Sequence, residues 1–410
     1  MEKYFNRSLS FILYLLLFIF PFFFLNLTQE YFVTNKLYWL GFGVLLLILI
    51  SIIQILISKK ISWQKWPFDN LILFFLTAVA ISTLFSSPNK IQALLNPNFG
   101  LVMMVSLAIL YFYLSRHIMK VLSFSSLILS LITIIFYFQP FKNIALPQNL
   151  VFLKNPGFTP VGSQLDLAVF LGFFVVLGIV SILRSNVIPS KEGIQTKISW
   201  IPVFTGMTLI INLLTLFLTV YSLVKPAGQT PNLGVSTLIL PPFRLSWFAA
   251  LEILKNPQTA IFGIGLDNFS AIFTRVKDFA YNQSPLWQIN SFNVSRSAVL
   301  QIFTETGIIG LLSFGLLIFS VMKSAFVKTT ADKQFISLFV YLIICLFVFP
   351  PSLIVWFLFF VVLGLVSQQS NNETMKQSTD LSNLMPTYIG TVIISIGLIG
   401  ASGYFLGRSY

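Results

Sequence analysis

The sequence predicts an all-α membrane protein, a polytopic transmembrane helical bundle with one long extracytoplasmic loop. Three observations lead to this fold class. Hydrophobic residues make up 56% of the 410 residues and charged residues only 9%, whereas a soluble domain has roughly 25% charged residues. Apolar stretches recur along the whole chain, each long enough to cross roughly 30 Å of hydrocarbon. Lysine and arginine gather in alternate loops, which is typical of cytoplasmic loops.

Hydropathy predicts about eleven spans, within a range of ten to twelve. The first follows Lys3 and Arg7, as a signal peptide would, but its apolar run is too long and no small-residue cleavage site follows. We therefore interpret it as a retained anchor. The spans lie near residues 8–27, 37–58, 67–86, 100–115, 121–138, 165–183, 200–223, 298–322, 334–349, 352–368 and 387–407.

The basic residues orient this bundle. With the N-terminus in the cytoplasm, 14 of the 25 Lys and Arg residues lie on the cytoplasmic side and 11 outside, six of them in the loop between Lys225 and Arg296. Without that loop the ratio is 14 to 5, which fits the positive-inside rule. The net charge of +13 is explained in this way, so we expect a lipid bilayer and no nucleic acid as partner.

The chain divides into N-terminal spans (1–223), an extracytoplasmic loop (224–297) and C-terminal spans (298–410). Within the loop, "PPFRLSWFAALEILKNP" (241–257) predicts an amphipathic helix at the outer membrane–water boundary. We expect Asn256-Pro257 to stop this helix. Its apolar positions are Trp247, Phe248, Leu251 and Leu254, and its polar positions are Glu252, Lys255 and Asn256.

The scarcity of cysteine and histidine excludes several kinds of site. Cys345 is the only cysteine and lies within a predicted span, so the chain has no intrachain disulfide and no cysteine-based zinc site. His117 is the only histidine and lies at a cytoplasmic helix end. We therefore expect no histidine-rich metal site, no Ser-His-Asp catalysis and no metal cofactor.

Polar residues enter one predicted span, near residues 298–322. Ser297, Gln301 and Glu305 are four residues apart, so they share one helix face. A carboxylate in a bilayer costs a few kcal/mol or more unless it is paired or hydrated. Glu305 therefore faces either a water-filled cavity or a neighbouring helix that satisfies it, and the sequence leaves both interpretations open.

Cations on the long loop oppose the orientation rule. Arg244 begins the amphipathic helix, Arg296 precedes the polar span, and Arg275 and Lys277 lie between them. Long loops tolerate charge, which is one explanation. The functional interpretation is an anion site at the membrane surface, because the guanidinium fork matches phosphate oxygens.

Two segments resemble the O-antigen ligase and O-antigen polymerase superfamily of bacterial envelope enzymes. "FRLSWFAALEILKNPQTAIFGIGLDNF" is similar to that family's arginine, tryptophan, amphipathic helix, "NP" and "GxGxxxF" pattern. "SRSAVLQIFTETGIIGLLSFGLLIF" is similar to its closing "HNxxLQxxxExGxxG" helix. With "GFTPVGSQLDLAVFLGFF" and "GLVMMVSLAILYFYLSR" upstream, the resemblance covers roughly residues 95 to 325.

The resemblance implies a multi-pass enzyme of the bacterial cytoplasmic (inner) membrane. Such enzymes transfer or polymerise an undecaprenyl-diphosphate-linked glycan onto a lipid, glycan or protein acceptor by metal-independent, inverting glycosyl transfer. On this basis Arg244, Arg296 and Glu305 are the candidate catalytic residues. The candidate substrate-binding residues are Arg275, Lys277, Gln301, Trp247 and Asp267.

One departure leaves the general base open. Where many family members have His-Asn, this chain has Arg296-Ser297, so no histidine is available in that register. Glu305, Asp267 and Glu252 remain as candidates. Two other functions also remain: a transporter or flippase for a lipid-linked or anionic substrate, and a catalytically inactive relative of the family.

Overall fold

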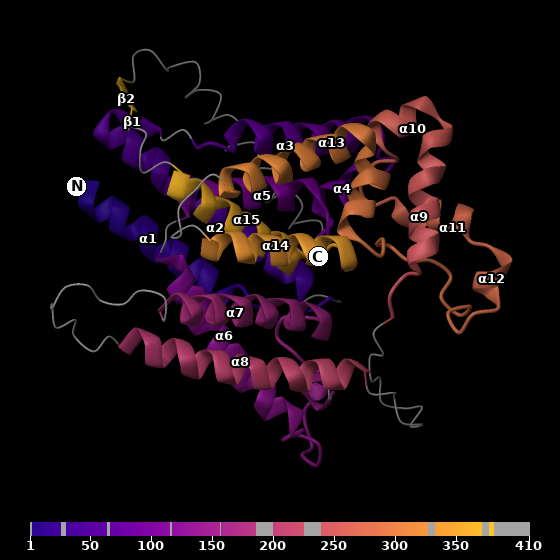
Figure 1. The fold of residues 1–410 in the computed structure, drawn as a ribbon, viewed down its shortest axis with the longest axis horizontal. Coiled ribbons are helices and arrows are strands. Elements are labelled where there is room, and N and C mark those ends of the chain that lie inside the picture. Colours follow the sequence, from indigo (N-terminus) through magenta and orange to yellow (C-terminus); the bar gives the residue numbers. More distant parts are fainter. Residues whose placement is uncertain are drawn as a thin grey trace.

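The computed structural model is an elongated bundle of helices (Figure 1). It describes residues 2–25, 30–63, 66–114, 117–155, 157–185, 200–224, 239–326, 333–370 and 377–380. Within these residues, five helices are long and apolar enough to cross a membrane, and five shorter apolar helices accompany them. The helices indicate a membrane protein, whereas the number of crossings stays a prediction.

Ten of the predicted spans coincide with helices. The first helix ends at Ile19, earlier than expected, because Pro21 cannot continue a helical hydrogen-bond pattern. The predicted span at 387–407 and most of the predicted turn at 184–199 lie outside the described residues. The helices are α1 (Glu2–Ile19), α2 (Val33–Ser58), α3 (Asp69–Phe85), α5 (Leu101–Tyr113), α6 (Ile118–Tyr137), α7 (Gln164–Ser185), α8 (Trp200–Val224), α13 (Ala298–Phe326), α14 (Lys333–Val348) and α15 (Leu353–Ser370).

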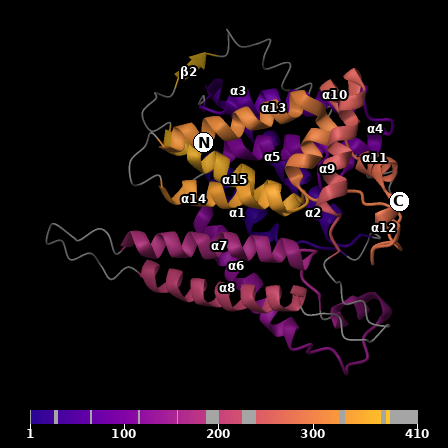
Figure 2. The same cartoon turned by 45° about the vertical axis from the view of Figure 1, so that its right-hand side comes forward.

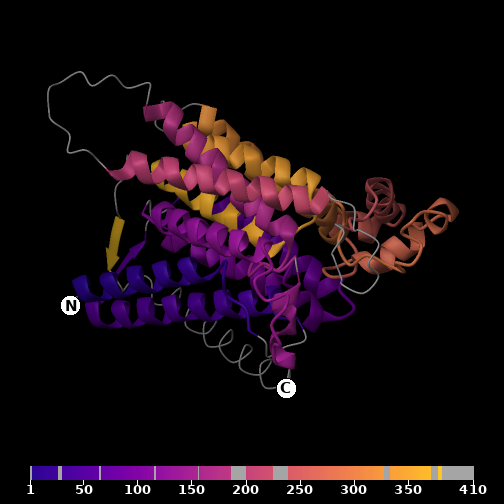
Figure 3. The ribbon, with the colours of Figure 1, turned by 90° about the horizontal axis from the view of Figure 1, so that it is seen from below.

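Shorter elements lie at the two ends of the bundle. Helices α9 to α12, with α4, gather at one end, which we call the loop end, and the strands lie at the other (Figure 1). Seen from below, helices α9 to α12 project beyond the bundle (Figure 3). These elements are α4 (Lys90–Leu95), η1 (Gln148–Lys154), α9 (Phe243–Glu252), η2 (Ile253–Lys255), α10 (Pro257–Phe262), α11 (Phe269–Val276), α12 (Phe279–Asn282), and β1 (Lys60–Trp63), which pairs antiparallel with β2 (Gln377–Asp380).

The predicted amphipathic helix ends before Asn256-Pro257. Helix α9 stops at Glu252 and continues as the 3-10 turn η2 to Lys255. The Asn256 side chain then accepts a hydrogen bond from the Gln258 N–H at 2.9 Å and caps α10, in which Pro257 is the first residue. The helical segment thus stops at the Asn-Pro pair, as predicted. The same pair also starts α10, because proline fits the first helical position without losing a hydrogen bond.

Helix α15 is the centre of the bundle. Its residues from Leu353 to Val366 are buried on every side, and it packs against α5, α7, α13 and α14. The fully buried Trp356 ring packs against Phe75 of α3, Phe314 of α13 and Phe359 of its own helix. A helix with no polar face suits this position, since every side of it meets other apolar helices.

Glu30 caps the start of α2 at the loop end. Its carboxylate accepts hydrogen bonds from the backbone N–H groups of Phe32, Val33 and Thr34, at 3.1, 2.9 and 2.6 Å. Burial alone would raise the pKa of Glu30, but these backbone bonds outweigh it and hold the pKa below its ordinary value. The ionised form is therefore the one that the folded chain favours.

Replacing Glu30 with glutamine is expected to lower the thermal stability at neutral pH by about 1 kcal/mol, the usual effect of losing a helix cap. Because the folded pKa is lowered, the wild-type advantage is present above the ordinary pKa of glutamate and disappears as the pH falls through the folded pKa. Thermal melting in nanodiscs from pH 7 to pH 3 measures this. Glu252→Gln is the control, since Glu252 pairs with the exposed Lys255. Equal losses in both variants would contradict the capping role.

Candidate functional site

Helix α13 is broken at Gly307. This residue has φ 67° and ψ −163°, so residues 298–306 and 308–326 are two helical segments that differ in direction (Figures 1 and 2). The break releases backbone carbonyl groups from the helical pattern. The carbonyl of Thr304 accepts the N–H of Ile264 at 3.1 Å, and that of Glu305 accepts the N–H of Gly265 at 3.1 Å. The loop before α11 thus supplies hydrogen-bond donors to the carbonyl groups at the break in α13.

Two glycines allow this close approach between two backbones. A Cβ atom on Gly263 would lie 2.1 Å from the carbonyl oxygen of Glu305. One on Gly265 would lie 2.4 Å from the backbone nitrogen of Ser87, at the end of α3. Both glycines have positive φ, 76° and 88°, which other residues rarely adopt. The "GxGxxxF" pattern is therefore explained by packing between the loop, α3 and α13.

A chain of hydrogen bonds runs through the first segment of α13. The fully buried Gln301 accepts the backbone N–H of Ser295 at 2.5 Å and donates through Nε2 to Oε1 of Glu305 at 2.5 Å. Glu305 is also fully buried, and its second oxygen, Oε2, has no hydrogen-bond partner among the described residues. The backbone N–H groups of Asp267 and Phe269 lie near this carboxyl group. Because buried polar atoms are normally paired, the oxygen without a partner is the position at which the group can carry a proton.

Asp267 lies close to this buried carboxyl group. It has φ 62° and follows the two loop glycines, and its carboxylate accepts a hydrogen bond from Asn96, beyond α4. Burial raises the pKa of Asp267, and the hydrogen bonds from Asn96 and Gln92 offset only part of that effect. The Asp267 carboxylate is near enough to Glu305 for the two charges to interact. Two carboxyl groups, the buried one of Glu305 and the half-buried one of Asp267, therefore lie close together.

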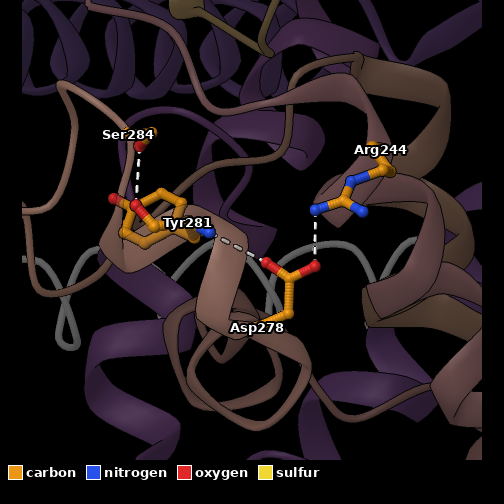
Figure 4. Close-up of polar contacts among 4 residues, drawn as sticks. All are labelled: Arg244, Asp278, Tyr281 and Ser284. Carbon is orange, nitrogen blue, oxygen red and sulfur yellow. Dashed lines mark hydrogen bonds and ion pairs between the residues drawn. The ribbon is translucent and has the colours of Figure 1, made fainter.

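Arg244 lies on the outer part of α9 and is paired. Its Nη2 donates to Oδ2 of Asp278 at 2.5 Å, and its side chain keeps 55% of its surface exposed (Figure 4). The other carboxylate oxygen of Asp278 accepts the backbone N–H of Tyr281 at 3.0 Å and so caps α12. An exposed pair of this kind contributes little to stability, so an anionic ligand can compete with Asp278 for the guanidinium.

The other predicted cations have different surroundings. The backbone N–H of Arg296 donates to Oγ of the buried Ser246 on α9, at 3.0 Å, and Arg275 is exposed at the end of α11. Lys277 lies over the ring of Tyr281, 4.7 Å from its centroid. Within the described residues, no contact joins two of these cations, so a shared anion pocket stays a prediction.

The structure brings together some of the predicted residues and separates others. Gln301 and Glu305 are bonded, and Asp267 lies beside them. Trp247 is exposed on α9 with 46% of its surface free, and the half-buried Glu252 pairs with the exposed Lys255 at 2.7 Å. Chemically, the buried carboxyl group can accept a proton, whereas the exposed cations can bind an anion.

Residues that the sequence did not single out bond to the backbone around Glu305 and Asp267. Ser82 donates through Oγ to the carbonyl of Glu305 at 2.5 Å, and Ser87 donates to the carbonyl of Leu266 at 3.3 Å. Serines in apolar helices are common, so no signal in the sequence marked these two. Elsewhere at the loop end, the buried Lys36 donates to the carbonyl of Pro160 at 2.6 Å. Lys36 is the fourth residue of the apolar helix α2, and this position in the sequence could have predicted that its side chain is buried.

Comparison with known proteins gives no relative for this chain. It matches no protein-family model, no curated protein and no solved structure.

Proposed function

We propose that the chain transfers or polymerises a glycan carried on undecaprenyl diphosphate, at the outer face of a bacterial cytoplasmic membrane. In this proposal eleven spans cross the membrane, the N-terminus is cytoplasmic, and the loop end faces outward. The acceptor is a lipid, a glycan or a protein. The proposal draws on the sequence resemblance to O-antigen ligases and polymerases and on the packing at the loop end.

One observation carries the proposal: the two segments that bear the resemblance form a single unit. The loop around Gly263 and Gly265 bonds to the carbonyl groups at the break in α13, and the backbone of Arg296 bonds to Ser246 of α9. The unit contains the buried carboxyl group of Glu305 and carries Arg244 and Arg296. This combination supplies the two functions that transfer from a lipid diphosphate requires: proton acceptance and stabilisation of a charged leaving group.

The proposed step is a substitution at the anomeric carbon of the glycan. An acceptor hydroxyl oxygen forms a bond to the anomeric carbon of the glycan, while the bond between that carbon and the diphosphate oxygen breaks. The electron pair of the broken bond leaves with the diphosphate, and Arg244 and Arg296 stabilise its negative charge. The hydroxyl proton passes to Glu305 or to Asp267. Lys277, Arg275, Gln301 and Trp247 contact the substrate in this proposal.

Alanine in place of Arg244 or Arg296 is expected to reduce glycan transfer roughly 10- to 100-fold, since each lost charge-assisted contact is equivalent to about 1.5–3 kcal/mol. The assay follows transfer from a radiolabelled lipid-diphosphate glycan in proteoliposomes. Lys255→Ala is the matched control, because Lys255 is also an exposed cation on this helical segment but pairs with Glu252. Wild-type turnover in both arginine variants would end the proposal, and binding without product in the wild type would favour a catalytically inactive relative.

A transporter or flippase is the second candidate, and the broken helix favours it. Transporters often bind substrates and coupling ions where a transmembrane helix is interrupted. Helix α13 is interrupted two residues after Glu305, whose Oε2 has no partner among the described residues. Uptake of a labelled lipid-linked glycan into proteoliposomes, driven by a proton gradient and lost in Glu305→Gln, would support this candidate over transfer.

A further inference from the structure

Helix α9 has two apolar faces, and only one of them is packed. Leu245, Ala249 and Ile253 are buried and contribute to a small core with Phe269 and Phe273 of α11. The second face continues into η2 and has large side chains at positions i, i+4, i+8 and i+11, each with 41% to 57% of its surface exposed. We call this set the α9 stripe; it consists of Phe243, Trp247, Leu251 and Leu254.

An exposed stripe of this size needs a partner other than water. Isolated apolar residues on a surface are ordinary, but a contiguous row marks an interaction site. Phe248, beside the stripe on the next position of the helix, is also 40% exposed. Helix α9 buries its other side against α11 and α13, so turning the stripe inward would expose the core that those helices share.

The stripe adjoins the lipid-facing surface of the bundle. Helix α10 follows η2 and packs against both α3 and α13, and its Ile261 is 43% exposed. Helix α3 ends with the exposed Leu84 and Phe85. Exposed apolar side chains thus occur on α3, on α10 and on α9. The 3-10 turn η2 contacts both α9 and α10 and adds the exposed Leu254 beside Lys255, which is paired with Glu252.

The direction of α9 fits a helix lying in a membrane interface. It runs crosswise to α3 and α7, at the end of the bundle (Figures 1 and 2). Cations lie at both ends of the stripe, Arg244 beside Phe243 and Lys255 beside Leu254. Interfacial helices combine aromatic and aliphatic side chains on one side with basic residues that meet lipid phosphates.

We infer that the α9 stripe docks on the lipid surface of the bilayer, with its side chains at the boundary between headgroups and acyl chains. The occupant is the phospholipid of the surrounding leaflet. The inference needs only that the apolar helices span a bilayer and does not depend on the proposed transferase activity. Ser246 of α9 accepts a hydrogen bond from the backbone of Arg296, which precedes α13. The depth of α9 in the bilayer therefore also sets the depth of the first segment of α13.

The test places a fluorescent label on the stripe of the full-length protein. Leu251→Cys in a Cys345→Ala background is labelled with bimane and reconstituted in nanodiscs of phosphatidylcholine and phosphatidylglycerol. Gln258→Cys is the matched control, because Gln258 is exposed at the start of α10 and lies off the stripe. Lipids with a nitroxide near the headgroup are expected to quench the Leu251→Cys label about threefold more than the control, since interfacial side chains lie about 5–10 Å deep. Iodide in the buffer should quench the Gln258→Cys label more strongly than the Leu251→Cys label.

Two results would overturn the inference. Equal quenching of both labels by iodide, without quenching by the nitroxide lipid, would place the stripe in water. Protection of the Leu251→Cys label from both quenchers would mean that protein covers it, such as a second copy of this chain. Leu254→Cys repeats the measurement on the same stripe if the Leu251→Cys variant does not fold, as judged by thermal melting. Glycan transfer is not part of the readout, so failure here leaves the proposed function untouched.

Discussion

Gly263→Ala is expected to leave little folded protein, with a loss of about 4 kcal/mol or more in the free energy of unfolding. The new Cβ would lie 2.1 Å from the carbonyl oxygen and 2.2 Å from the carbonyl carbon of Glu305. Both are backbone atoms, which cannot rotate away as the end of a side chain can. The conformation of Gly263, φ 76° and ψ −177°, adds strain for any residue with a Cβ, on the order of 1–3 kcal/mol.

The clash also breaks hydrogen bonds. If the loop moves away, Ile264 and Gly265 no longer donate to the carbonyl groups of Thr304 and Glu305, and buried polar groups without partners are costly. Thermal melting in nanodiscs and limited proteolysis of residues 239–297 measure the effect. Gly315→Ala on α13 is the control, because nothing lies within 4 Å of a Cβ at Gly315; it should be neutral or slightly stabilising. Equal melting of both variants would contradict the docking of the loop on α13.

Glu305→Gln is expected to reduce glycan transfer about a thousandfold, within the range for loss of a general base, while the protein stays folded. Glutamine has the same shape and keeps an oxygen to accept the hydrogen bond from Gln301, but it does not take up a proton. The measurement compares transfer in proteoliposomes with thermal melting of the same preparation. A large loss of transfer with unchanged melting is the expected pattern.

Asp267→Asn identifies which of the two carboxyl groups accepts the proton. If Asp267 is the base, transfer in the wild type rises with pH through the raised pKa of this group, and the asparagine variant loses activity as strongly as Glu305→Gln. If Glu305 is the base, Asp267→Asn has a smaller effect, through its contact with Asn96. Full activity of Glu305→Gln would mean that this carboxyl group is structural, one of the two interpretations that the sequence left open.

Most of the helical segments could be predicted, because apolar length is a local property of the sequence. Ten predicted spans coincide with helices, and the helix predicted within residues 241–257 is present as α9 and η2. The Asn256-Pro257 pair has two roles: the helical segment ends at Lys255, as predicted, and α10 begins at Pro257, which the sequence did not indicate. Helices α4, α11 and α12 are too short for a hydropathy pattern to identify, since packing rather than composition stabilises them.

The polar residues of the candidate site could be predicted, but the break in α13 and the contacts between distant segments could not. Spacing by four placed Gln301 and Glu305 on one face, and they are bonded as that spacing requires. The break at Gly307 was not predictable, because a glycine inside an apolar run is compatible with a continuous helix. Nor did the sequence indicate that Arg244 pairs with Asp278, a contact across 34 residues that depends on how α9 and α12 pack.

The sequence by itself determined that this is a helical membrane protein, because a lipid environment demands long apolar helices whatever their arrangement. Only the tertiary structure decided which polar groups meet. The docking of Gly263 and Gly265 on a broken helix, the buried position of Glu305 and the exposed stripe on α9 all arise from contacts between distant segments. Such contacts depend on shape and on backbone hydrogen bonds, and neither is encoded in the local pattern of residues.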